Sequence, residues 1–319
     1  MKAIVQDSYG DLDEVLRLVD IEKPVPAAGE VLVRVRAAPV VGGDWHLMRG
    51  LPYLARPITG LRRPRNRVPG LELAGAVEEV GPGVDSLDVG DEVFGWCSGA
   101  FQEYAAVPAG QLARKPANLT VEQAAAVPIS GFTALQAVRD LGRVGPGTKV
   151  LVHGATGSVG TYAVQLAKVF GAEVTAVCGA AKADLARDLG ADHVHDYATG
   201  EPPGGFDVLV DLYGNPSLRT CRRLVRKGGA VVLVGGTGGC WFMGTDRWLR
   251  ALVAAPFLGF KAKPLVHKDR HEDLLFLRDL IESGRLTPVL DRTYPLADVA
   301  KAVEDVRRGR VRGHAVVTP

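Results

Sequence analysis

A glycine-spaced segment at residues 150–160 (VLVHGATGSVG) has the residue types that suit binding of a dinucleotide's phosphates. Ala155, Gly157 and Gly160 occupy the three positions of a G-x-G-x-x-G pattern, with alanine at the first. In that pattern the first residue makes a tight turn, the second leaves room for a pyrophosphate, and the third lets helix and strand pack closely. A helix that begins there offers free N–H groups to phosphate. We therefore predict a cofactor site that includes Ala155, Thr156, Gly157, Ser158, Val159 and Gly160.

The identity of the cofactor is indicated about 20 residues further along, where NAD-binding sites usually carry Asp or Glu for the ribose 2′-hydroxyl. Residues 177–182 (VCGAAK) contain no acid and end in Lys182. The small Gly179 leaves room for a 2′-phosphate, and Lys182 can supply positive charge. These residues favour NADPH over NADH. A solvated lysine at the start of a helix is the alternative reading of Lys182.

The first third of the chain contains short β segments with turn signals such as Gly81-Pro82-Gly83 between them. Short strands at this spacing predict a compact, barrel-like β domain. The predicted strands are Lys2–Val5, Val31–Ala37, Ala76–Val80 and Glu92–Phe94.

From about Leu119 onward, strand and helix patterns alternate. Thr120 is a predicted N-cap, with Gln123 at the third position of the first turn. Continuous apolar strands alternating with helices predict a parallel sheet covered on both faces. After about Pro264 this rhythm stops, and we expect the C-terminal piece to return to the first domain. The predicted strands are Lys149–His153, Glu173–Cys178, His193–His195, Asp207–Asp211, Ala230–Val234 and Ala315–Val317, and the predicted helices are Val159–Phe170, Ala181–Leu189, Pro216–Val225, Leu274–Ser283 and Asp298–Arg308.

Charge and cysteine content exclude several classes of function. The 38 basic and 36 acidic residues give a net charge of +2, which makes no electrostatic case for a nucleic-acid or membrane partner. No apolar run approaches the roughly 18–20 residues that span a bilayer, and the N-terminus has acids where a signal peptide needs an apolar core. The four cysteines are isolated, which is typical of a reducing, cytoplasmic setting.

Several motifs together resemble one family. Gly70–Gly83 (GLELAGAVEEVGPG), Val89–Gly95 (VGDEVFG), the loop His153–Gly160 and Leu189–Tyr197 (LGADHVHDY) resemble the medium-chain dehydrogenase/reductase superfamily. Within it they are similar to the zinc-independent quinone oxidoreductase branch that includes zeta-crystallin. The resemblance runs from Met1 to Thr318. It implies an α/β fold: a GroES-like, β-rich catalytic domain at residues 1–120, a doubly wound Rossmann NADP-binding domain at 121–263, a C-terminal return to the catalytic domain at 264–319, and an active site in the cleft.

The resemblance also decides what to expect about zinc. The positions that match the family's catalytic zinc ligands hold Val41, then Leu71 and Glu72, then approximately Ile129. A lone carboxylate cannot hold catalytic zinc, which needs about three protein ligands. We therefore expect no metal, and we expect Glu72 to be a structural hydrogen-bonding residue. Without a Lewis acid, the expected reaction is hydride transfer from NADPH to a small-molecule quinone or α,β-unsaturated carbonyl compound, an enone or enoyl substrate.

The family's substrate segment matches residues 38–46 (APVVGGDWH), where Val41 replaces the usual Asn and is joined by Asp44 and Trp45. His46 stands where many relatives have a tyrosine, and Tyr53 lies near a second such position. Either could donate a hydrogen bond or a proton to the substrate oxygen. A packing role for His46 and a solvent-derived proton are the alternatives.

Further contacts carry over from the family. The apolar segment Trp241–Phe260 is expected to cover the substrate through Trp241, to form the interface of a homodimer, or to pack in the core. Tyr197 matches a tyrosine that flanks the 2′-phosphate, with a packed strand-end tyrosine as the alternative. The remaining expected cofactor contacts are Thr133, Tyr213, Gly235, Gly236 and Thr237.

Two alternative functions stay open at this stage, motivated by Val41 and by His314, which stands where relatives commonly have lysine. One is a zinc-free carbonyl or alcohol oxidoreductase. The other is a cofactor-binding protein with a structural or redox-neutral biosynthetic role. Residues 56–67, which hold five arginines and no acid, could favour an anionic substrate or the cofactor phosphate, or form a solvated loop.

Overall fold

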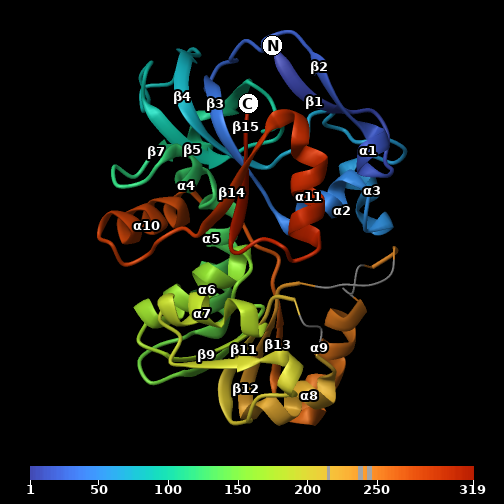
Figure 1. Cartoon of the computed structure of the whole chain (residues 1–319), viewed down its shortest axis with the longest axis vertical. Helices are drawn as coiled ribbons and strands as arrows, with labels where there is room; N and C mark the ends of the chain where they lie inside the picture. The colour runs from blue at the N-terminus through green and yellow to red at the C-terminus, as the bar shows by residue number, and fades with distance from the viewer. Residues whose placement is uncertain (214–215, 236–239, 243–245) are drawn as a thin grey trace. The chain divides into compact units, whose positions relative to one another are not determined.

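The computed structural model describes residues 1–213, 216–235, 240–242 and 246–319 and divides into two compact units (Figure 1). Unit 1 comprises Met1–Ser130, Asp269–Gly284 and Pro288–Pro319; unit 2 comprises Gly131–Lys268 and Arg285–Thr287. The domain boundaries expected from the sequence lie at residues 120 and 263. Among the described residues, no helix has the length and apolar character that crossing a membrane requires.

Unit 1 is built on a seven-stranded sheet with the order β14-β15-β3-β4-β5-β7, in which β6 also pairs with β3. Alternate residues of the long strand β3, such as Val31, Val33 and Val35, are buried in the core. The C-terminal strand β15 pairs antiparallel with β3, so both ends of the chain contribute to this unit. The sheet strands are β3 (Glu30–Val40), β4 (Glu72–Val80), β5 (Glu92–Trp96), β6 (Tyr104–Pro108), β7 (Leu112–Arg114), β14 (Leu290–Pro295) and β15 (His314–Thr318), and β1 (Lys2–Gln6) pairs separately with β2 (Leu16–Asp20).

Short helices surround this sheet. The predicted N-cap at Thr120 is confirmed: the Gln123 backbone N–H donates to Thr120 Oγ1 at 3.2 Å, and the Thr120 backbone N–H donates to Gln123 Oε1 at 3.1 Å. The helices are α1 (Leu12–Val15), α2 (Gly42–Met48), the 3₁₀ turn η1 (Tyr53–Ala55), α3 (Arg56–Thr59), α4 (Val121–Ala125), α10 (His271–Glu282) and α11 (Val299–Arg307).

Unit 2 contains the predicted parallel sheet, with six strands in the order β10-β9-β8-β11-β12-β13. Strand order runs outward from β8 in both directions, so the chain reverses its winding between β8 and β11. In such sheets, ligands bind at the carboxyl ends of the strands beside this switch point. The elements are α5 (Pro128–Leu135), which enters from unit 1, η3 (Gln136–Gly142), β8 (Lys149–His153), α6 (Ser158–Val169), β9 (Glu173–Cys178), α7 (Ala183–Asp188), β10 (His193–Asp196), β11 (Phe206–Asp211), α8 (Leu218–Leu224), β12 (Val225–Leu233), α9 (Asp246–Leu258) and β13 (Lys261–Pro264).

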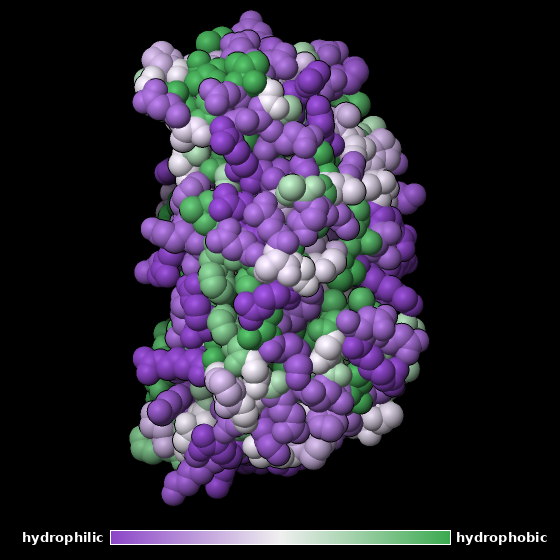
Figure 2. Space-filling view, turned by 90° about the vertical axis from the view of Figure 1, so that its left-hand side faces the viewer, coloured by the Kyte–Doolittle hydropathy of each residue, from purple (hydrophilic) through white to green (hydrophobic). Residues whose placement is uncertain are grey.

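Within the apolar segment Trp241–Phe260, residues Asp246–Leu258 form a helix, α9, which the sequence pattern did not reveal. Its buried positions include the small residues Ala251 and Ala255, whereas Leu249, Val253 and Phe257 are exposed. Several large apolar side chains therefore lie on the outer face, which departs from the usual amphipathic pattern, whereas Trp248 and Leu258 pack against the core. By contrast, the face shown in Figure 2 is mostly hydrophilic, with hydrophobic residues visible in small separate groups.

Candidate cofactor and substrate site

The glycine loop connects β8 to α6 in unit 2, as the spacing predicted. A Cβ on Gly160 would lie 2.1 Å from the Gly154 carbonyl oxygen, so only glycine allows this close approach of loop and helix. Gly157 is exposed and caps α6 without a side-chain hydrogen bond; a Cβ there would meet only the Gly154 oxygen, at 3.6 Å. Ala155 and Thr156 are buried beneath the turn. The first turn of α6 thus presents backbone N–H groups across an open position, a cradle that fits a pyrophosphate.

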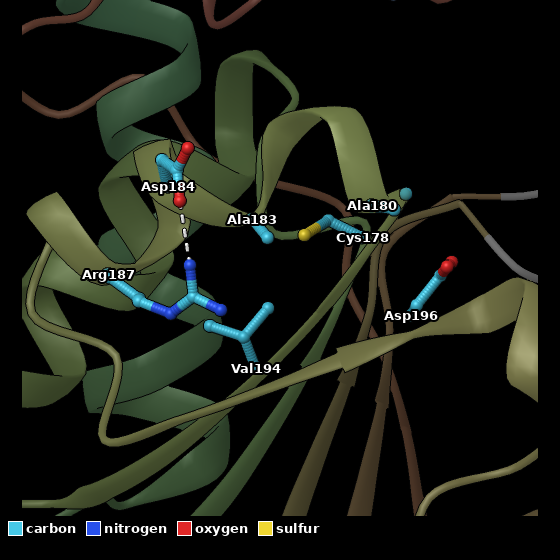
Figure 3. Close-up of a pocket in the computed structure, with 8 residues that line it drawn as sticks. Cys178, Ala180, Ala183, Asp184, Arg187, Val194 and Asp196 are labelled. Carbon is cyan, nitrogen blue, oxygen red and sulfur yellow. Dashed lines mark hydrogen bonds and ion pairs between the residues drawn. The ribbon is translucent and has the colours of Figure 1, made fainter.

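A cavity of about 360 Å³ lies at the carboxyl end of β9 (Figure 3). Gly179 lines this cavity, and a Cβ on it would be 3.1 Å from the Tyr197 hydroxyl, so the tyrosine ring packs against the glycine. Arg187 donates to Asp184 Oδ1 at 2.7 Å on one side of the cavity, and Asp196 lies on the other side.

The predicted Lys182 stands in the chain between Ala180 and Ala183, which line this cavity. Burial raises the pKa of the Cys178 thiol and Asp196 raises it further, whereas the positive charges of Lys182 and Arg187 oppose the rise. Sequence reasoning missed Arg187. It follows Ala180, Ala183 and Asp184 at helical i, i+3, i+4 and i+7 spacing, and this signal could have placed it on the cavity wall.

Two further predicted cofactor residues lie at the ends of neighbouring strands. Tyr213 follows β11, and a Cβ on Gly154 would be 3.1 Å from the Tyr213 Cβ. Gly235 follows β12, where a Cβ would lie 2.5 Å from the Leu212 carbonyl oxygen. Both therefore flank the glycine loop. Thr133 is buried in α5. Gly236 and Thr237 lie outside the described residues.

A buried ion pair that the sequence did not reveal ties this strand edge together. Asp211, which ends β11, is 1% exposed and accepts from Arg247 Nη1 at 2.5 Å. The other Asp211 oxygen lies 3.3 Å from His153 Nδ1, at the end of β8. This network fixes the residue that precedes the glycine loop to the start of α9.

The predicted substrate segment, residues 38–46, runs from the end of β3 through Val41 into the first turns of α2 in unit 1. Asp44 is 2% exposed and accepts from the Val41 backbone N–H at 2.8 Å, so it caps this helix. Burial raises the pKa of Asp44 to about 7, against the opposing effect of that hydrogen bond. Trp45 lies between two cations, with the guanidinium groups of Arg49 and Arg307 5.4 and 5.5 Å from its ring centroid.

His46 and Tyr53, the predicted hydrogen-bond donors to substrate, both belong to unit 1 and are half-buried. Burial lowers the pKa of His46, which keeps its imidazole neutral near pH 7. His46 Nδ1 is buried and has no hydrogen-bond partner among the described residues. Tyr53 is covered by Arg56, whose guanidinium lies 4.4 Å from the ring centroid.

Glu72 is a structural hydrogen-bonding residue, as expected. It is 0% exposed, and its Oε2 accepts from the Ile129 backbone N–H at 2.8 Å at the start of α5. Burial raises the pKa of Glu72 well above its usual value, and the nearby charges of Asp44 and Asp269 act in the same direction.

The residues in this part of unit 1 do not fit a zinc site. Of the positions that match the family's catalytic zinc ligands, only Glu72 holds a residue that can bind zinc, because Val41 and Leu71 are apolar. In the described part of the chain, no group of three or more His, Cys, Asp or Glu side chains is placed to hold a metal ion. His314 stands where relatives commonly have a lysine. It is buried, and its Nδ1 lies 3.2 Å from the Val289 carbonyl oxygen within unit 1.

Comparison with known proteins covers both units. Residues 27–117 match the alcohol dehydrogenase GroES-like domain family, and residues 189–317 match the zinc-binding dehydrogenase family. The chloroplast envelope quinone oxidoreductase homolog of Arabidopsis thaliana is 31% identical over 337 residues, which cover 100% of this chain and 98% of the relative.

Solved structures agree with these matches. The quinone oxidoreductase from Coxiella burnetii superposes with a TM-score of 0.89 at 27% identity, covering 100% of this chain and 99% of that one. The JamJ enoyl reductase in its apo form superposes with a TM-score of 0.82 at 27% identity, covering 99% of both chains. This chain is therefore a member of the medium-chain dehydrogenase/reductase superfamily, in its quinone oxidoreductase-like branch.

Proposed function

We propose that this protein is an NADPH-dependent, zinc-independent reductase that transfers a hydride to a quinone or an α,β-unsaturated carbonyl compound. The observation that carries the proposal is the state of Glu72: one oxygen accepts from the Ile129 N–H, and among the described residues Glu72 belongs to no group of three or more His, Cys, Asp or Glu side chains placed to hold a metal ion. A hydride acceptor with a conjugated carbonyl needs less polarisation than a simple ketone does. The family membership and the relatives named as quinone and enoyl reductases support the same reaction class.

The nicotinamide cofactor fits the glycine loop of unit 2. When bound, it supplies the hydride. The first-turn N–H groups of α6, exposed across Gly157, would hold its pyrophosphate. Gly179, Lys182 and Tyr197 accommodate a 2′-phosphate, because no acid occupies residues 177–182. Thr133 in α5 would lie at the nicotinamide end, as the family resemblance implies.

The polar residues of α2 orient the acceptor. His46 is neutral near pH 7, so it can donate one N–H to a carbonyl oxygen that gains negative charge. The Tyr53 hydroxyl is the second donor. The side chain of Val41, which is buried and apolar, adds no hydrogen bond where the family usually has the side chain of Asn. The predicted homodimer and cytoplasmic location stay predictions.

Steady-state NADPH oxidation with a panel of quinones and enones tests the proposal, with NADH in parallel and with a chelator in matched reactions. We expect turnover that the chelator leaves unchanged and that favours NADPH. Reduction of simple ketones with enones inert would support a carbonyl oxidoreductase instead. Stoichiometric NADPH binding without consumption would support a redox-neutral or structural role.

A further inference from the structure

Residues 51–70 form a strongly basic stretch of unit 1, with five arginines and no acidic residue. Three of these arginines are committed to local contacts. The Arg56 guanidinium lies over the Tyr53 ring, Arg67 Nε donates to Asp7 Oδ1 at 2.7 Å, and Arg65 donates to a backbone carbonyl at 3.1 Å. Three of the five arginine side chains therefore have a local partner.

Arg62 and Arg63 are the remaining pair. Both are exposed, and neither has a hydrogen-bond or ion-pair partner within the described part of the chain. Their backbone is nevertheless held in a tight turn. Gly60 has φ +124°, a Cβ there would lie 1.9 Å from the Arg63 carbonyl oxygen, and the Tyr9 hydroxyl donates to the Gly60 carbonyl at 2.9 Å. Two adjacent, unpaired guanidinium groups are therefore presented on a turn of defined shape.

This turn is connected to the predicted substrate helix. The Leu51 backbone N–H donates to the His46 carbonyl oxygen at 2.8 Å, and Arg56 Nε donates to the Gly50 carbonyl oxygen at 2.9 Å. The arginine turn is thus tied to the end of α2. A ligand held by Arg62 and Arg63 would lie on the same unit as the side chains expected to orient the acceptor.

The chemistry of the pair points to phosphate. A guanidinium presents its N–H donors in a planar fork that pairs with two phosphate oxygens, and two neighbouring guanidinium groups suit a diphosphate or two nearby phosphates. Quinones and simple enones carry no charge that needs such a site. An enoyl thioester on a phosphorylated pantetheine arm carries negative phosphate groups that such a site would bind. Its thioester carbonyl also activates the double bond toward hydride.

We propose that Arg62 and Arg63 bind the phosphate groups of an enoyl thioester substrate at a distance from its reacting double bond. This inference rests on the proposed reductase function and specifies the substrate class for it. Binding energy from such a remote handle lowers KM without taking part in the hydride transfer.

The test compares two substrates that share one trans-2-enoyl group, carried on coenzyme A or on N-acetylcysteamine, which has no phosphate. In the double variant R62S/R63S, we expect kcat/KM for the coenzyme A thioester to fall by roughly 100-fold, about tenfold per charge-assisted contact. The kcat/KM for the N-acetylcysteamine thioester should stay within about twofold of the wild-type value. The matched control R219S/R222S removes two positive charges from α8 and should leave kcat/KM unchanged for both thioesters.

Equal loss with both thioesters, or no loss with either, would overturn the proposal. A raised KM for NADPH in R62S/R63S would also overturn it, because the arginines would then bind cofactor phosphate. A second readout needs no turnover: calorimetric titration of free coenzyme A into protein saturated with NADP⁺. Tight binding that R62S/R63S weakens would support the handle even if no acceptor is reduced, and the reductase proposal would then fail by itself.

Discussion

Replacing Glu72 by alanine and by glutamine tests whether its carboxyl group is neutral or ionised in the folded protein. Glu72→Ala leaves the Ile129 N–H unpaired in a buried place and removes a fully buried side chain. An orphaned buried donor costs about 1–3 kcal/mol, and the small cavity adds to it, so we expect a total loss of about 2–4 kcal/mol. Glu72→Gln keeps a carbonyl oxygen for Ile129 and resembles a protonated carboxyl, so its cost should be below about 1 kcal/mol.

The pH dependence gives the sign of the effect. Because burial raises the folded-state pKa of Glu72, the folded protein binds this proton more tightly than the unfolded chain does. The contribution of this proton to the free energy of unfolding is fully present below the unfolded-state pKa of about 4.5 and is lost as the pH rises toward the folded-state pKa. Glu72→Gln cannot ionise, so its free energy of unfolding should improve relative to wild type between pH 5 and pH 8.

The assay is urea unfolding at pH 5, 7 and 8, followed by tryptophan fluorescence in a background where Trp241 and Trp248 of unit 2 are replaced by phenylalanine, so that Trp45 and Trp96 report on unit 1. Glu79 lies on the same strand, β4, and is exposed, so Glu79→Ala and Glu79→Gln are matched controls that should change stability by less than about 1 kcal/mol. Glu72 is not a buried neutral acid if Glu72→Gln destabilises the protein as much as Glu72→Ala does. The same holds if the difference in the free energy of unfolding between Glu72→Gln and wild type does not change with pH. Zinc-dependent stabilisation of wild type alone would contradict the account as well.

Three further predictions concern unit 2. The exposed Arg187–Asp184 pair contributes only about 0–1 kcal/mol, so Asp184→Asn should free Arg187 and raise kcat/KM for NADPH several-fold. Arg187→Ala should lower kcat/KM for NADPH, and neither variant should change kcat/KM for NADH much. Shifts in the opposite direction, or equal shifts with both cofactors, would refute this prediction. Gly160→Ala places a Cβ 2.1 Å from a backbone oxygen, so it should weaken NADPH binding at least tenfold in a fluorescence titration, and wild-type affinity would contradict the loop geometry. Asp211→Asn leaves the Arg247 charge buried and should cost about 3–5 kcal/mol in urea unfolding; a loss below 1 kcal/mol would show that the pair is not buried in solution.

Local spacing predicted much of unit 2. The strands Lys149–His153 and Glu173–Cys178 were located to the residue, and the glycine loop follows from positions only a few residues apart. These features depend on short-range sterics: glycine at a close approach, apolar runs in buried strands, and a Thr120 cap. Each can therefore be inferred from neighbouring residues alone.

Other features depend on contacts between distant residues or on unusual burial. The Asp211–Arg247 pair joins positions 36 apart, and no local pattern announces it. Helix α9 was missed because small alanines occupy buried positions while large apolar residues such as Leu249, Val253 and Phe257 are exposed. For Glu72, the resemblance supplied the position, but the Ile129 N–H that it accepts from became visible only in the folded chain.

The central claim, hydride transfer from NADPH to a conjugated carbonyl acceptor without zinc, is tested most directly by single-turnover reaction of NADPH carrying deuterium at C4, in separate 4R and 4S preparations. The protein is first dialysed against a chelator, and the acceptor is an enone. The account predicts one deuterium at the β-carbon of the saturated product, from only one of the two preparations, at a rate that added zinc does not change. Recovery of unreacted enone with bound, unoxidised NADPH, or transfer that appears only after zinc is restored, would contradict it.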